Sequence, residues 1–94
     1  TETWARELGP SNIRVNAIQP GVVEGARIES VIAGQAKLKG KSIEETKKSL
    51  LAHVSLRRMV TAQDIAETTM FLMSDAAKNV SGQSIAVDAN VETI

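Results

Sequence analysis

The sequence contains no cysteine and no tyrosine, and its one histidine is His53. Without cysteine, disulfides, thiolate catalysis and cysteine-based metal sites are excluded. Without tyrosine, no phenol is available as a general acid, and one histidine cannot form the histidine pair of a typical zinc site. We therefore expect no metal site, and we interpret His53 as a surface or packed side chain rather than a catalytic one.

Excess charge and long apolar runs are also missing. Lysine and arginine together number 11, aspartate and glutamate also number 11, and the formal net charge is zero. A nucleic-acid or anionic-membrane partner requires a basic surface, so neither is expected. No apolar run is long enough to cross a bilayer. We expect a soluble, cytoplasmic protein whose 94 residues make at most one small domain with a thin core.

The most informative stretch is an apolar run that leads into a turn. Residues 13–18 predict a β-strand, and Pro20 and Gly21 predict the turn that ends it. A helical pattern precedes the strand and stops at Gly9 and Pro10, with Gly9 expected in the left-handed C-cap conformation. Ligands of open α/β sheets bind at the carboxyl ends of strands, so this turn is the first candidate site.

The remaining elements are indicated by apolar spacing and by helix caps. An apolar stripe at helical spacing begins near Ile28 and ends before Gly40. Two capping boxes, Ser42 with Glu45 and Thr61 with Asp64, predict where two further helices begin, the second extending over 61–73. Alternating apolar residues predict a last strand over 84–88.

Two strands separated by helical segments predict a parallel pair joined by a right-handed crossover, hence an α/β fold. A parallel pair by itself leaves both edges open and both faces uncovered. We therefore expect the chain to be part of a larger sheet or to complete itself by oligomerising. The chain also starts within a helical pattern at Thr1, which suggests a fragment.

Several blocks resemble the short-chain dehydrogenase/reductase family, in the family's order and spacing, and together they span nearly all of the chain. They are 4–10 (WARELGP), 13–21 (IRVNAIQPG), 57–59 (RRM), 64–66 (DIA), 71–75 (FLMSD) and 81–88 (SGQSIAVD). The resemblance implies the carboxyl-terminal part of a Rossmann-type, doubly wound parallel sheet, in an enzyme that moves a hydride between NAD or NADP and an alcohol or carbonyl substrate.

The resemblance also says which parts of the site are missing. The family's glycine-rich phosphate turn and its Tyr-x-x-x-Lys pair would lie upstream of Thr1. No catalytic residue of the family is therefore carried by residues 1–94, and the chain alone is expected to be inactive. A non-catalytic remnant or an oligomerisation module is the alternative. The substrate and the choice between NAD and NADP are not readable.

The cofactor residues implied by the resemblance are those of the turn: Pro20, Gly21, Val22, Val23 and Gly25. Glycine lets the backbone approach the nicotinamide closely, and the Val23 amide is the expected donor to the carboxamide oxygen. Gly25 stands where the family usually has threonine. Ala89 stands where the family more often has glycine, so we expect it to restrict φ there.

Residues 26–56 correspond to the family's substrate lid, with Glu24, Arg27 and Ile28 as candidates for substrate contact. The lysines of the lid suit an anionic substrate or form a solvated face. By resemblance, residues 62–73 and 84–88 are expected to make a homo-oligomer, dimer or tetramer, in which residues 91–94 reach a partner.

Single side chains outside the turn have simpler interpretations. Arg14 and Asn16 share one side of the first strand and are interpreted as structural, because buried polar groups need partners. Trp4, Met70 and Phe71 are expected to lie in the core or in a subunit contact, since aromatic and long apolar side chains bring large area to either.

Overall fold

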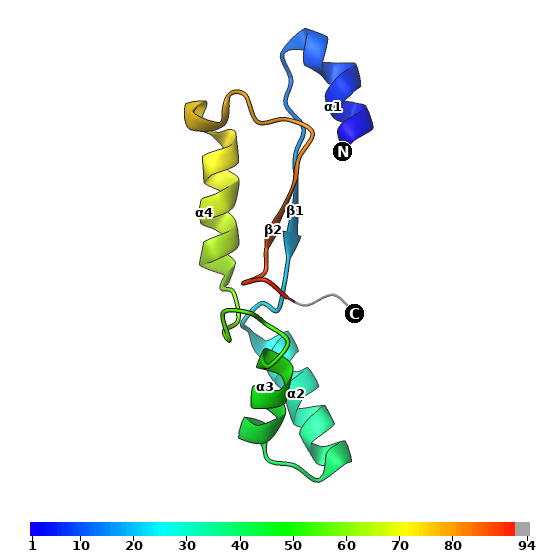
Figure 1. The fold of residues 1–94 in the computed structure, drawn as a ribbon, viewed down its shortest axis with the longest axis vertical. Helices are drawn as coiled ribbons and strands as arrows, with labels where there is room; N and C mark the ends of the chain where they lie inside the picture. The colour runs from blue at the N-terminus through cyan, green and yellow to red at the C-terminus, as the bar shows by residue number, and fades with distance from the viewer. Residues whose placement is uncertain (92–94) are drawn as a thin grey trace.

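The computed structural model describes residues 1–91. Helix α1 (Glu2–Leu8) and a 3₁₀ turn, η1 (Gly9–Ser11), lead to strand β1 (Ala17–Pro20). The chain then forms α2 (Ala26–Lys39), α3 (Ile43–Leu51), α4 (Ala62–Met73), the 3₁₀ turn η2 (Asp75–Ala77) and strand β2 (Ser84–Val87). In Figure 1, α4 runs alongside the strands, α1 lies at one end, and the α2–α3 hairpin extends from the other.

The two strands pair in parallel, as the sequence predicts, with Ala17 opposite Ser84 and Pro20 opposite Val87. The ladder begins four residues later than the expected strand at Ile13. Before the ladder, the loop ahead of β2 holds the chain instead: Gly82 N–H donates to the Val15 carbonyl at 2.8 Å. This contact is irregular, so residues 13–16 are outside the sheet.

Arg14 and Asn16 have the structural role that the sequence indicates. Arg14 Nη1 donates to the carbonyl of Leu72 at 2.7 Å and so reaches the last turn of α4. Asn16 Nδ2 donates to the Val80 carbonyl at 2.9 Å, and its Oδ1 accepts from the N–H of Gln83 at 3.1 Å. These bonds satisfy part-buried polar groups and join the start of β1 to the other elements.

The expected cap at Gly9 is wrong. Gly9 has φ −55° and ψ −46°, a right-handed helical conformation, and the chain continues into η1. Proline fits there because the first turn of a helix has no internal partner for its N–H. The left-handed residue is Asn12, with φ 60°. Asparagine tolerates this conformation better than most side chains.

Both predicted helix starts are confirmed. Thr61 Oγ1 accepts from the Asp64 N–H at 3.0 Å, and an Asp64 carboxylate oxygen accepts from the Thr61 N–H at 2.8 Å, completing a capping box. At α3, Ser42 Oγ accepts from the Glu45 N–H at 3.1 Å, the first half of such a box. Gly40 ends α2 with φ 65°, as a left-handed C-cap.

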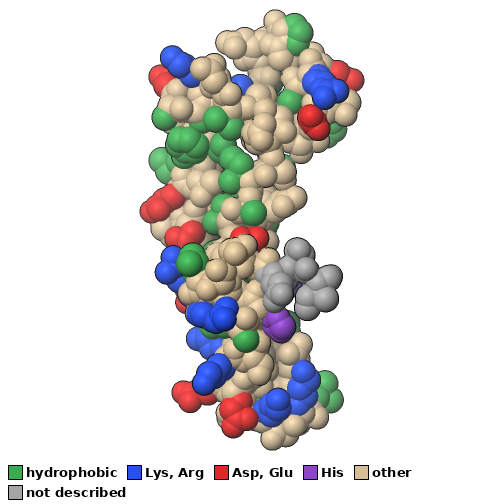
Figure 2. Space-filling model, viewed as in Figure 1, with side chains coloured by type: hydrophobic (Ala, Val, Ile, Leu, Met, Phe, Trp, Pro, Cys, Tyr) green, Lys and Arg blue, Asp and Glu red, His purple; other side chains and the backbone are tan. Residues whose placement is uncertain are grey.

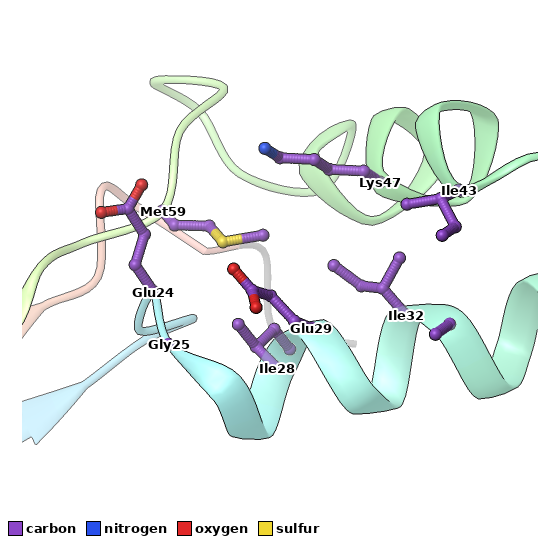
Figure 3. Close-up of a pocket in the computed structure, with 9 residues that line it drawn as sticks. Glu24, Gly25, Ile28, Glu29, Ile32, Ile43, Lys47 and Met59 are labelled. Carbon is purple, nitrogen blue, oxygen red and sulfur yellow. The ribbon is translucent and has the colours of Figure 1, made fainter.

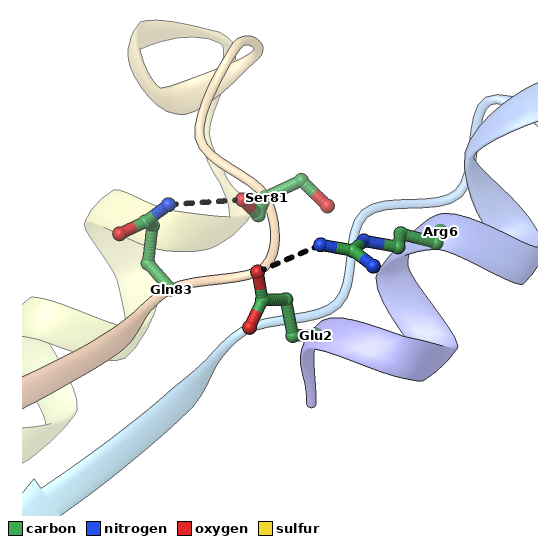
Figure 4. A network of polar contacts seen from close by, with 4 residues as sticks. All are labelled: Glu2, Arg6, Ser81 and Gln83. Carbon is green, nitrogen blue, oxygen red and sulfur yellow. Dashed lines mark hydrogen bonds and ion pairs between the residues drawn. The ribbon is translucent and has the colours of Figure 1, made fainter.

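Helix α1 lies against the loop that precedes β2. Gly82, at φ +75°, faces it: a Cβ there would stand 3.5 Å from that of Ala5. Figure 4 shows this corner, where Arg6 pairs with Glu2 at 3.2 Å and Gln83 Nε2 donates to the Ser81 carbonyl. The ion pair is on the exposed face of α1, where such pairs add little stability.

The core is small. The buried apolar residues among those described are Ile32, Ala36, Val54, Val60, Leu72 and Ala77. Trp4 is 66% exposed and Met70 70% exposed, so neither is in the core of these residues. Phe71 is 49% exposed. Figure 2 shows apolar side chains at the surface along α4. These side chains are therefore uncovered within the described residues, and other polypeptide of the same domain or of a second subunit would have to cover them.

The molecule is long and narrow, measuring 56 × 24 × 21 Å (Figure 1). Its radius of gyration is 17.2 Å, whereas a compact domain of this length has about 12 Å. The α2–α3 hairpin therefore stands apart from the sheet and joins it mainly through the segments on either side of the lid. Within residues 1–91, no helix combines the length and the apolar character that a membrane crossing requires.

Candidate functional site

The turn expected at Pro20 and Gly21 is wrong, because Pro20 still pairs with Val87 inside β1 and the chain bends at Val22 instead. The segment that follows, here called the turn after β1, is fixed on both sides. Gly21 N–H donates to the Val87 carbonyl at 3.1 Å, which continues the ladder. Val60 N–H donates to the Val22 carbonyl at 2.9 Å, and Glu24 N–H donates to the Val60 carbonyl at 2.8 Å. Val23 and Val60 thus form an isolated parallel bridge. Neither bond uses the N–H of Val23, and no acceptor for it is found among residues 1–91.

Gly21 is required by a contact within the chain. A Cβ at this position would lie 2.5 Å from Cβ of Asp88 and 2.7 Å from its Cα. Carbon atoms of residues far apart in the chain do not approach this closely without a bond between them. One of the two strand ends would therefore have to move. The sequence interpretation gave Gly21 a role in close approach to the nicotinamide. The structure adds a separate cause, the close packing of the two strand ends.

Gly25 is at the root of the lid and is also conformationally constrained. It has φ 149° and ψ −179°, a conformation open almost only to glycine, and it is the N-cap of α2 without a side-chain bond. No atom lies within 4 Å of the position its Cβ would take. The backbone therefore accounts for a glycine at the place where the family usually has threonine.

The lid root is also held by the turn after β2. Ser55 N–H donates to the Asn90 carbonyl at 2.9 Å, and Leu56 N–H donates to the Ala89 carbonyl at 3.1 Å. Ala89 was expected to restrict φ, yet it takes φ 54°, a left-handed conformation that favours glycine. Val91 forms a bridge with Val54. The expected contact of residues 92–94 with a partner lies outside the described residues.

A cleft of about 770 Å³ opens beside this turn, between α2 and α3 (Figure 3). Its lining residues are Glu24, Gly25, Ile28, Glu29, Ile32, Ala33, Ile43, Lys47 and Met59. Two of the three expected substrate-contact residues, Glu24 and Ile28, are therefore at the cleft. Arg27 is not among the residues that line it.

Sequence reasoning did not identify Glu29, Lys47 and Met59 as lining residues. Helical spacing carries part of the missing signal. Ile43 and Lys47 are four residues apart on α3, so they share one face of the helix. What the spacing does not reveal is that this face of α3 is turned toward α2. That orientation is set by the loop between the two helices.

Most basic residues of the α2–α3 hairpin lie outside the cleft. Lys39 and Lys41 line a separate hollow of about 190 Å³ that also includes His53. Lys48 lines another with Arg57. Figure 2 shows the lysine and arginine side chains spread over the outside of the hairpin. The lysine excess of the lid sequence therefore does not describe the cleft itself.

The cleft supplies an apolar wall and charged side chains. Away from it, the Thr61 backbone N–H and hydroxyl hold the pKa of the Asp64 carboxyl below its ordinary 3.8. That shift belongs to the helix cap. No group of three or more potential metal ligands was found among residues 1–91.

Comparison with known proteins gives a consistent result. A family model described as enoyl-(acyl carrier protein) reductase matches residues 1–91. A 3-oxoacyl-(acyl-carrier-protein) reductase of Thermotoga maritima is 34% identical over 91 residues, which are 97% of this chain and 32% of that protein. The chain therefore spans about a third of that relative's length.

Two solved structures extend the match to three dimensions. A short chain dehydrogenase family protein of Francisella tularensis superposes with a TM-score of 0.86 at 34% identity, over 95% of this chain and 37% of the other. An NAD⁺-bound xylitol dehydrogenase gives a TM-score of 0.76 at 29% identity, over 93% of this chain and 35% of the other. The expected α/β fold, part of a Rossmann-type sheet, is confirmed.

Proposed function

Because the chain belongs to the short-chain dehydrogenase/reductase family, we propose that it forms the carboxyl-terminal part of an oxidoreductase that uses NAD or NADP on an alcohol or carbonyl substrate. Its contribution is the turn that binds the nicotinamide end of the cofactor, the substrate lid and a subunit contact. Bound at this turn, NAD⁺ or NADP⁺ would accept a hydride from an alcohol, and the reduced cofactor would donate it to a carbonyl. The alcohol proton would pass to, or return from, the Tyr-x-x-x-Lys pair that the family carries.

One observation carries this proposal. The N–H of Val23 takes no part in the bridge with Val60. It lies at the carboxyl end of a parallel strand, where α/β sheets bind their ligands, and next to an apolar cleft. The neighbours of Val23, Val22 and Glu24, are both hydrogen-bonded to Val60, so the direction of the Val23 N–H is set before a ligand binds. A donor fixed in this way suits a carboxamide oxygen.

The lid role rests on the position of the hairpin. Helix α2 begins immediately after the turn and α3 follows it, and the cleft between them opens beside Glu24 and Gly25. A substrate held there would meet the nicotinamide at the root of the lid. Movement of the hairpin on that root would admit substrate and exclude water, as lids do in other enzymes.

The subunit-contact role rests on exposed apolar side chains. Met70 and Phe71 of α4 leave 70% and 49% of their surface uncovered in the described chain. Burying such side chains in a dimer or tetramer would remove apolar area from water.

The second candidate function is a non-catalytic remnant or an oligomerisation module. It is motivated by the absence of tyrosine, the proton donor of the family, from residues 1–94.

A test of the main proposal removes the amide N–H donor of Val23 by substitution with proline. Val23→Pro deletes the free N–H and costs no hydrogen bond of the bridge. We expect the dissociation constant for NAD or NADP to rise roughly 3- to 10-fold, the worth of one hydrogen bond. Calorimetric titration of the natural protein, including any segment that precedes Thr1, measures it, and NAD(P)H absorbance follows the reaction with alcohols and ketones.

The matched control is Val23→Ala, which keeps the N–H and shortens the side chain. It should bind cofactor within about 2-fold of the natural protein. Equal affinities for all three proteins would show that the amide makes no contact. Absence of cofactor binding by the natural protein would reject the oxidoreductase proposal and leave the remnant. Micromolar binding by residues 1–94 alone would reject the remnant instead.

A further inference from the structure

The cleft between α2 and α3 combines an apolar wall with acidic groups at its mouth. Ile28 and Ile32 project from α2 and Ile43 from α3, and Met59 closes the side toward the turn (Figure 3). Ile32 is buried. This wall suits a hydrocarbon body, because burial of apolar surface stabilises a bound ligand.

The carboxylates at the mouth have no basic partner. Figure 3 shows Glu24 and Glu29 pointing into the space beside Met59, with the ammonium of Lys47 extending from α3 on the opposite side. Neither carboxylate lies within 4.0 Å of a basic nitrogen of residues 1–91, where the ion pair found is the distant Glu2–Arg6 pair. Two negative charges therefore face one positive charge across the cleft.

We propose that this cleft selects a small secondary alcohol, or the matching ketone, with an apolar body and a cationic group that the Glu24 and Glu29 carboxylates attract. The inference rests on the proposed function and names the substrate class of that same site. It replaces the expectation of an anionic substrate that the lid's lysines suggested. A negatively charged substrate would meet two like charges at the mouth.

The positions of the other lysines support this choice. Lys39 and Lys41 line a different hollow, so they do not offset the acidic charge at the mouth. Lys47 is the basic residue of the cleft. Opposite charges attract weakly in bulk water and more strongly beside a low-dielectric wall such as the one formed by Ile28 and Met59. The selectivity should also weaken at high ionic strength.

The experiment compares three alcohols that share one skeleton and differ in terminal charge: 6-amino-2-hexanol, 2-heptanol and 6-hydroxyheptanoate. The natural protein is assayed for kcat/KM with each, and ligand binding is measured separately by calorimetry. We expect the ammonium compound to be preferred over the methyl compound by roughly 3- to 10-fold, with the carboxylate last. Glu24→Gln with Glu29→Gln should bring the ammonium-to-methyl ratio to one or below, because the positive charge of Lys47 remains.

Two matched variants separate the cleft from general surface charge. Glu44→Gln removes the same charge from α3 outside the cleft and should leave the ratio unchanged. Lys47→Gln should raise the ratio, whereas Lys48→Gln, one residue along, should not. A preference for the carboxylate, or a ratio that is the same in the natural protein and the double variant, would overturn the proposal.

The calorimetric binding measurement distinguishes selection of a cationic ligand by the cleft from the proposed oxidoreductase activity. Preferential binding of the ammonium compound without any NAD- or NADP-dependent turnover would support charge selection and count against the oxidoreductase. Turnover of all three alcohols at equal kcat/KM would support the oxidoreductase and reject charge selection.

Discussion

Gly21 shapes the fold through both its N–H and its missing side chain. Its N–H extends the ladder to Val87, and its missing side chain leaves room for Asp88. The same close approach brings the turn after β1 against the turn after β2, which in turn holds the lid root through Ala89 and Asn90. The turn after β1 and the α2–α3 hairpin that follows it are thereby tied to one strand end by the absence of a single Cβ.

Gly21→Ala should therefore destabilise the protein even without cofactor. The added carbon overlaps Asp88, and overpacking of this kind costs about 1–3 kcal/mol of unfolding free energy. Urea unfolding followed by circular dichroism measures the loss. Gly34→Ala is the control: it lies inside α2 with no atom within 4 Å of the added carbon. It should stabilise by up to about 1 kcal/mol through helix propensity.

If Gly21→Ala matched the natural protein in stability and weakened only cofactor binding, the packing explanation would be incorrect. The glycine would then be required by the ligand alone.

At the level of single residues, the sequence shows which positions are constrained better than it shows which contacts constrain them. The expected strand over 13–18 and the turn at Pro20 and Gly21 are offset from the structure, in which Pro20 still pairs with Val87 and the bend follows at Val22. Asp88 as the neighbour of Gly21 was not predictable, since the two are far apart in the chain. Glu29 and Lys47 were missed for the same reason: their shared cleft depends on how α2 meets α3, and local spacing carries no information about that.

At the level of elements, the caps gave the most reliable predictions, because a cap involves residues only three apart. The Thr61–Asp64 box begins α4 as expected, and Gly40 ends α2. The predicted left-handed cap at Gly9 was wrong because a glycine before a proline is compatible both with such a cap and with the start of a 3₁₀ turn. Which one forms is decided by the contacts of the next residues, 13–16, with the loop before β2.

Asp64 also gives α4 an acid-dependent start. The Thr61 backbone N–H, followed by the Thr61 hydroxyl, lowers the pKa of the Asp64 carboxyl in the folded state below its ordinary 3.8. A carboxyl with a depressed folded-state pKa contributes stability that is fully present above its unfolded pKa. That stability is lost as the pH falls through the folded-state value.

Asp64→Asn should therefore lower the unfolding free energy at neutral pH, and the difference from the natural protein should shrink as the pH falls below 3.8. Urea unfolding at several pH values between neutral and strongly acidic conditions measures this. Glu67→Gln, which removes a charge from the same helix outside the box, is the control and should show a much smaller difference. A deficit for Asp64→Asn that stays constant with pH would argue against the carboxylate cap.

At the level of the whole molecule, the parallel pair and the α/β class followed from the sequence, but the extent of burial did not. The sequence predicts that Met70 lies in the core or in a subunit contact, yet this side chain is 70% exposed among the described residues. Spacing shows which face is apolar and gives no information on whether a partner covers it. The open shape and the exposed apolar face have one explanation, namely that other polypeptide completes the core.

Residues 1–94 produced alone should therefore not behave as a stable monomer. A radius of gyration of 17.2 Å for 94 residues, against about 12 Å for a compact domain, indicates too little buried area to offset the conformational entropy of folding. We expect low helicity by circular dichroism and a broad, non-cooperative urea transition, or association seen by light scattering. The natural protein, with any segment preceding Thr1, should unfold cooperatively under the same conditions. A cooperative transition of monomeric residues 1–94 would show instead that the α2–α3 hairpin and the α4–sheet layer are together sufficient, and that the apolar face of α4 needs no partner.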